Sequence, residues 1–318
     1  MYFPAAGIEV SIWIPPLVAL VISFFTSMGG VSGAFLLLPF QMSILGYTSP
    51  SVSATNQLFN IVAIPGGVYR YFKEGRMVWP LVWVVVAGTL PGVFLGAIIR
   101  LTWLPDPTSF KLFAAAVLLY IGGRMIMDLL RPAAGGGGSE QRFQELVRSH
   151  RQRAAEAGAE SPEALPVVRV THFNRKRLGY TFYGEQFDIP FWGILGLSLA
   201  VGVVGGIYGI GGGAIIAPFF VSVFGLPVYT VAGAALTGTF VTSVAGVAFY
   251  QVLAPFYPEM SVAPDWLLGL LFGLGGLIGM YLGARCQKYV PARAIKVLLC
   301  LILLFTAGKY GLDFLTGL

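Results

Sequence analysis

Two glycine-rich stretches carry the strongest chemical signal in the sequence. They are Gly29, Gly30, Ser32 and Gly33 in the first half, and Gly209, Gly211, Gly212 and Gly213 in the second half. Each lies inside an apolar run and predicts a break, after which a new helix starts near Gly33 or Gly212. The first backbone N–H groups of a helix have no internal partner and carry partial positive charge, and glycine lets a ligand approach them. Together the stretches predict a site for a small anion.

Close helix packing is the alternative explanation for such glycines. We prefer it for six glycines that are spaced by four residues, namely Gly88, Gly92, Gly96, Gly275, Gly279 and Gly283. For the two stretches we prefer the anion site, because Ser32 and the turn spacing suit a helix start better than a packing seam.

Polar side chains follow each stretch. Asn56 and Asn60 share one helical face with Gln57 beside them, and the corresponding segment of the second half carries Thr237 and Thr239, followed by Thr242 and Ser243. Amides and hydroxyls can donate hydrogen bonds to carboxylate or sulfonate oxygens. Hydrogen bonding between helices explains each single residue equally well.

Ionisable residues are missing from the middle of the apolar segments. No Asp, Glu, His or Lys lies there, although a proton relay, a metal centre or a catalytic triad would need such groups. The sequence also has no nucleotide-binding loop and no metal-ligand spacing. We therefore expect no enzyme activity, no metal and no cofactor.

The composition places these residues in a membrane. Of the 318 residues, 56% are hydrophobic and 11% are charged, which is typical of a helical integral membrane protein. The first basic residue is Arg70, so residues 11–28 predict a retained membrane segment and not a cleaved signal peptide. Basic loops beside an inner membrane explain the net charge of +6, so we expect no nucleic-acid partner.

The apolar segments form two sets that repeat. They cover residues 12–28, 33–45, 50–72, 78–100 and 110–130, and then 191–208, 212–225, 228–253, 264–286 and 292–315. A shift of 179 residues pairs Gly33 with Gly212 and Gly67 with Gly246, and later segments pair at 187 and 185. The sequence therefore predicts an all-α membrane protein with repeats at 1–130 and 191–318.

Charge predicts the orientation of the repeats. The basic residues gather around the turns at 73–77 and 287–292 and in the polar insert 131–190, whereas the turns at 101–109 and 254–263 have none. If the basic parts are cytoplasmic, both termini lie outside and the second repeat is inverted relative to the first. Each repeat then crosses the membrane an odd number of times. The glycine-broken pieces are either two short spans or a re-entrant hairpin, and we favour short or re-entrant helices.

The insert predicts a small cytoplasmic appendage. It contains 16 of the charged residues and both histidines. Residues 135–139 predict a flexible hinge, 140–157 an exposed helix, and the alternating stretches near 167–189 a short hairpin.

The chain resembles the TauE/SafE family of sulfite and organosulfonate exporters. The resemblance rests on the turn at 209–213, its degenerate copy at 29–33, and the downstream segments FLLLPF (35–40) and AIIAPFF (214–220). It covers nearly the whole chain except the insert. The resemblance implies outward transport of a sulfur-containing anion, such as sulfite or sulfoacetate, across a bacterial-type inner membrane.

Two other functions remain open at this point, and a homodimer is plausible for the fold. One is transport or exchange of other small anions. The other is a membrane anchor or sensor that acts through residues 131–190.

Overall fold

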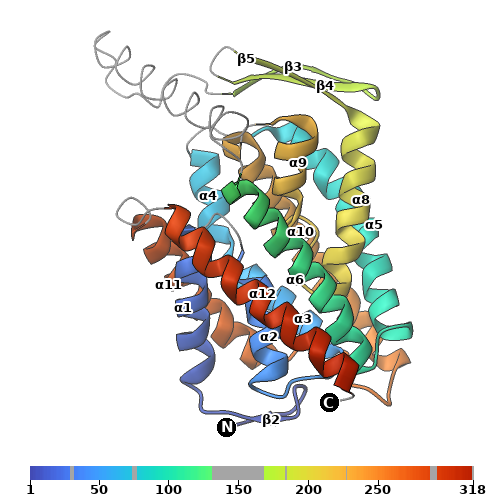
Figure 1. Cartoon of the computed structure of the whole chain (residues 1–318). Coiled ribbons are helices and arrows are strands. Elements are labelled where there is room, and N and C mark those ends of the chain that lie inside the picture. The colour runs from blue at the N-terminus through green and yellow to red at the C-terminus, as the bar shows by residue number, and fades with distance from the viewer. Residues whose placement is uncertain are drawn as a thin grey trace.

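A computed structural model describes residues 1–28, 32–73, 77–130, 168–182, 185–226, 228–286 and 292–316. This part of the chain is mostly helical, with two small antiparallel sheets (Figure 1). Gly29, Gly30 and the predicted hinge and exposed helix at 135–157 lie outside the described residues.

The first half begins with a hairpin and continues as helices. Its elements are β1 (Tyr2–Phe3), β2 (Ile8–Glu9), α1 (Ile14–Met28), α2 (Ala34–Ser43), α3 (Ser51–Ala63), α4 (Pro65–Lys73), α5 (Trp79–Thr102) and α6 (Pro107–Leu130). The second half follows the same order, with a longer sheet in place of the hairpin. Its elements are β3 (Val168–Phe173), β4 (Arg177–Phe182), β5 (Glu185–Pro190), α8 (Phe191–Tyr208), α9 (Ile216–Phe224), α10 (Val228–Leu253), η2 (Ala254–Phe256), α11 (Trp266–Cys286) and α12 (Ala292–Thr316).

Within the described residues, six helices are long and apolar enough to cross a membrane. They are α5, α6, α8, α10, α11 and α12. Helices α1 and α2 are apolar but shorter. Helix α2 has only 10 residues and α9 only 9, so neither approaches the roughly 20 residues that a full span needs.

The glycines spaced by four residues pack helices of one half against helices of the other. Three glycines of α5 face backbone carbonyls of α8: Gly88 faces Leu195, Gly92 faces Leu199 and Gly96 faces Val203. Three glycines of α11 face backbone carbonyls of α1 in the same way: Gly275 faces Pro16, Gly279 faces Leu20 and Gly283 faces Phe24. A Cβ atom at any of these six glycines would lie within 3.0 Å of the carbonyl oxygen it faces. The predicted packing role of these glycines is therefore confirmed.

These contacts are reciprocal between the two halves. Each contact of α5 on α8 has a counterpart of α11 on α1, between residues that correspond in the repeat. Figure 1 shows α1 rising from the end of the molecule that carries both termini, whereas α8 descends from the sheet at the opposite end. These observations support the predicted inversion, which stays a prediction, as does the side of the membrane on which each end lies.

Two predicted boundaries are wrong. The segment predicted at 50–72 is divided at Ile64 into α3 and α4, because Pro65 has no backbone N–H group and its ring clashes with the preceding turn. Its counterpart α10 carries Val244 at this position and is continuous. The helix predicted to start near Gly212 starts at Ile216, because residues 212–215 form a turn. The start near Gly33 is confirmed, since α2 begins at Ala34.

The described part of the insert packs on the helices. Strands β3, β4 and β5 form one antiparallel sheet and not a simple hairpin, and Leu178, Tyr180, Phe182 and Ile189 are buried in the main core. The Tyr180 hydroxyl lies 2.8 Å from Thr230 Oγ1 at the start of α10. Burial raises the pKa of this phenol, and the hydrogen bond partly offsets that rise. This sheet is thus tied to the helix bundle.

Candidate functional site

Asn60 joins the two glycine breaks at a buried point between the halves. Its Oδ1 accepts a hydrogen bond from Ser32 Oγ at 3.2 Å, beside the start of α2. Its Nδ2 donates to Ile210 O at 2.9 Å, inside the second break, and to Ser243 Oγ of α10 at 3.5 Å. Asn60 is fully buried on α3, so the two breaks meet around one amide although 150 residues separate Asn60 from Ile210.

The second break has a backbone that only glycine tolerates well. Gly209 ends α8 with φ +81°, and Gly211 has φ +76°, in the left-handed region. The Gly212 N–H donates to Thr242 Oγ1 of α10 at 3.0 Å. At the first break, Ser32 Oγ accepts from the backbone N of Ala34, the first residue of α2, at 3.3 Å, whereas the N-cap position itself is Gly33 and has no side-chain cap.

The glycines of the second break also pack closely against neighbouring helices. A Cβ atom at any of them would lie within 3.0 Å of Ser53 (at Gly209), Ser243 (at Gly211), Thr89 (at Gly212) or Ala235 (at Gly213). Close helix packing, the alternative explanation for these four glycines, therefore accounts for them in this conformation. A direct contact between their N–H groups and an anion stays a proposal.

Two buried side chains near the breaks have no hydrogen-bond partner among the described residues, Gln57 next to Asn60 on α3 and Ser23 next to Gly33. Both amide atoms of Gln57, one turn away on α3, lack a hydrogen bond, and this amide lies against Gly246 of α10. Ser23 Oγ on α1 also lacks one and lies 2.9 Å from the position of a Cβ on Gly33. Buried side chains without a hydrogen-bond partner are uncommon, and a bound anion is one kind of partner that could satisfy these two.

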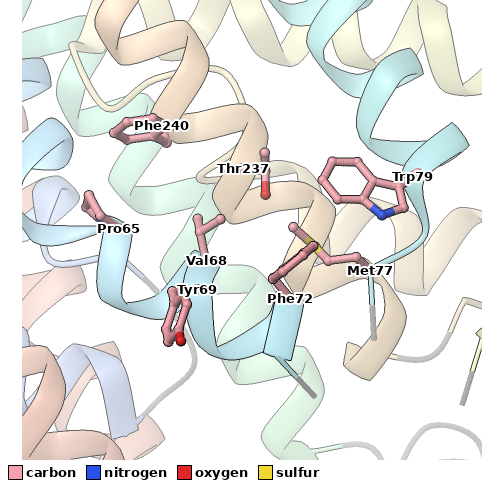
Figure 2. Close-up of a pocket in the computed structure, with 8 residues that line it drawn as sticks. All are labelled: Pro65, Val68, Tyr69, Phe72, Met77, Trp79, Thr237 and Phe240. Atoms are coloured by element: carbon pink, nitrogen blue, oxygen red, sulfur yellow. The ribbon is translucent and has the colours of Figure 1, made fainter. Parts of the chain in front are cut away.

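The other predicted polar residues divide between this cluster and other places. Asn56 donates to Ala34 O at 3.0 Å and accepts from Gln41 at 3.4 Å, so it joins α3 to α2. Thr239 contacts Gly211 and Gly213 and donates to Ala235 O. Thr237 faces elsewhere, in an open apolar groove lined by α4, the start of α5 and α10 (Figure 2).

Sequence reasoning missed three buried polar residues that contact Gly33, Asn56 or Gly209. They are Ser23, Gln41 and Ser53. Only their position inside apolar segments, where a polar residue is unusual, could have indicated them. It also missed Arg100, the one cation that is fully buried among the described residues; a lone arginine in the apolar run of α5 was the available signal.

Thr242→Val is expected to lower the stability by about 1–3 kcal/mol, because the buried Gly212 N–H would lose its acceptor. Thr237→Val makes the same change on the same helix, where the hydroxyl only donates to Gly233 O at 2.8 Å. We expect it to change stability by less than about 0.5 kcal/mol. Thermal melting of the two purified variants measures the difference; equal melting temperatures would contradict the assigned role of Thr242.

The centre is polar but uncharged. The residues that Asn60 and Gly212 join carry hydroxyl, amide and backbone groups, and no Asp, Glu, His, Lys or Arg is among them. Within the described residues no group of three His, Cys, Asp or Glu could hold a metal ion. Such a centre can bind a small anion by donated hydrogen bonds without a covalent or redox step.

A bundle of membrane-spanning helices, with two broken helices that meet at a buried polar centre, is the architecture of a membrane transporter. The family model for the sulfite exporter TauE/SafE matches residues 16–310. The chain therefore belongs to the TauE/SafE sulfite exporter family and is a multi-pass membrane transporter. No curated protein and no solved structure gives a significant match.

Proposed function

We propose that this protein exports sulfite or a small organosulfonate, such as sulfoacetate, across the inner membrane. The observation that carries the proposal is the buried, unpaired amide of Gln57 next to Asn60, where the two breaks meet, together with the unpaired hydroxyl of Ser23 beside Gly33. Gln57 and Ser23 would donate to the oxygens of the anion, and Ser32 lies at the positive end of α2. An anion at Gly212 N–H would displace the hydroxyl of Thr242.

Export of a net negative charge needs no coupled ion in a cell that is negative inside. One charge gains about 2.3 kcal/mol per 100 mV as it leaves. Among the described residues that meet at the centre, none has a carboxylate that could carry a proton. We therefore propose uniport, with one repeat moving against the other to expose the centre to each side in turn.

Sulfite and sulfoacetate efflux from proteoliposomes tests the proposal, with the voltage set by a potassium diffusion potential. We expect the efflux rate to increase with inside-negative voltage. At clamped voltage, we expect a pH gradient to leave the efflux rate unchanged. Efflux that follows the pH gradient would contradict uniport. Absence of efflux for both anions, from protein that elutes as a folded species, would contradict the proposed cargo.

Gln57→Leu locates the site. The amide has no partner among the described residues, so its loss should leave the fold intact and remove a hydrogen bond to the anion. That bond contributes about 1.5–3 kcal/mol. At low sulfite concentration, we therefore expect the efflux rate per unit of sulfite concentration to fall roughly 10- to 100-fold. Ser198→Ala is the matched control, because Ser198 Oγ is also buried without a partner but faces Gly88. Equal effects of both variants would exclude a specific role for Gln57.

A further inference from the structure

Arg100 is a buried cation at the end of the molecule that carries the N-terminal hairpin. It lies in the last turn of α5 and is fully buried. Its neighbours Ala97 and Leu101 pack with Tyr250 and Val262, next to Ser261, whose hydroxyl donates to Ala5 O. This is the end predicted to face outside.

The guanidinium is only partly satisfied by the protein. Its Nη1 donates to Leu104 O, and its central carbon lies 3.8 Å from the centre of the Phe110 ring. Its Nε and Nη2 have no partner among the described residues. The same part of the chain places no carboxylate within 4.0 Å of it.

Asp106 interacts electrostatically with Arg100 but forms no ion pair with it. Asp106, in the turn after α5, is exposed and accepts a hydrogen bond from Ser109 N at 2.8 Å. That backbone N–H group, as the main cause, lowers the pKa of the Asp106 carboxyl, so the carboxylate serves as a helix cap and stays in water. A buried cation without a hydrogen-bonded anion is strongly unfavourable, and the two unpaired nitrogens, Nε and Nη2, can donate side by side to two oxygens of an oxyanion.

Arg100 also connects to the central site through hydrogen-bonded groups. Tyr250 is an electrostatic neighbour of Arg100, and its hydroxyl donates to Gly206 O at 3.4 Å, in the last turn of α8 before the second break. Ser53, which lies beside that hydroxyl, donates to Ile207 O at 3.1 Å and packs on Gly209. Polar groups therefore lead from the glycine break to Arg100.

We infer that Arg100 forms a second binding position for the transported oxyanion, between the central site and the outer end. The inference rests on the proposed function, because the cargo is the anion that would pair with the guanidinium. Nε and Nη2 would hold two of its oxygens, while Phe110 and Leu104 O keep the side chain in place. Both nitrogens are buried in this conformation, so an anion reaches them only in a conformation that exposes the guanidinium.

Equilibrium binding of radiolabelled sulfite to the purified protein in detergent tests the inference. We expect two sulfite ions per chain for the natural protein and one for Arg100→Met. Arg100→Lys keeps the positive charge but loses the planar pair of guanidinium N–H donors. This variant should bind two sulfite ions, the second at least about 10-fold more weakly than the natural protein does. Arg285→Met is the matched control: Arg285 also stacks on a ring, Tyr281 at 4.8 Å, but is exposed, and this variant should bind two.

The outcomes separate this inference from the proposed function. One sulfite per natural chain, lost in Gln57→Leu and kept in Arg100→Met, would overturn the Arg100 position and leave the central site standing. Binding lost in Arg100→Met and unchanged in Gln57→Leu would overturn the central site instead. If Arg100→Met does not fold, Arg100→Lys decides, because an unchanged affinity for both ions in that variant would overturn the inference.

Discussion

Gly209→Ala is expected to prevent folding or to lower the melting temperature far more than Gly225→Ala. Both glycines end a helix in the left-handed conformation, with φ +81° and +65°. Alanine pays about 1–2 kcal/mol for that conformation at either position. At Gly209 the new Cβ would also collide with the backbone of Ser53 on α3. At Gly225 no atom lies within 4 Å of the position of the new Cβ.

The collision at Gly209 cannot be relieved by a side-chain rotation. The atoms that a Cβ would meet are the Ser53 carbonyl and Cα, so α8 and α3 would have to separate, and overpacking of this kind costs about 1–3 kcal/mol or more. Thermal melting by size-exclusion chromatography in detergent compares the two variants. If both melt within a few degrees of each other, the close contact of the second break with α3 is not present in solution.

Asn60→Asp is expected to reduce sulfite efflux by about 100-fold or more. The carboxylate keeps the shape of the amide but replaces the Nδ2 donor, which faces Ile210 O at 2.9 Å, with an acceptor. It also places a negative charge where the two breaks meet. At roughly 6 Å from a bound anion, with an effective dielectric constant of about 20, the repulsion is about 3 kcal/mol, or roughly 100-fold.

A second substitution separates charge from the lost hydrogen bonds. Asn60→Leu removes the same bonds to Ser32 and Ile210 without a charge, so we expect it to fold less stably but to transport better than Asn60→Asp. Efflux is measured in proteoliposomes and divided by the amount of folded protein. If both variants give equal efflux, a negative charge at residue 60 does not reduce transport. That result would contradict an anion site beside Asn60.

The centre was only partly predictable, and the failures have a common cause. Ser32 and Asn60 were expected at the site and do meet, whereas Thr237, only two residues from Thr239, faces the groove of Figure 2. Residues two apart on a helix point in different directions. When a helix is apolar on all sides, the sequence pattern does not indicate which face packs against the protein interior. For the same reason Gln57 could be placed beside Asn60, but its missing partner could not be foreseen.

Local features of the chain were sufficient for the membrane class, the start of α2 and the packing role of the glycines on α5 and α11. Each depends on hydrophobic length, repeated spacing or the loss of a side chain, which act over neighbouring residues. Only the tertiary structure decided that α5 pairs with α8, that Asn60 reaches Ile210, and that Arg100 is buried without an ion pair to any described carboxylate. These outcomes depend on contacts between distant segments, whose free energy is set by shape and by the burial of polar groups in three dimensions.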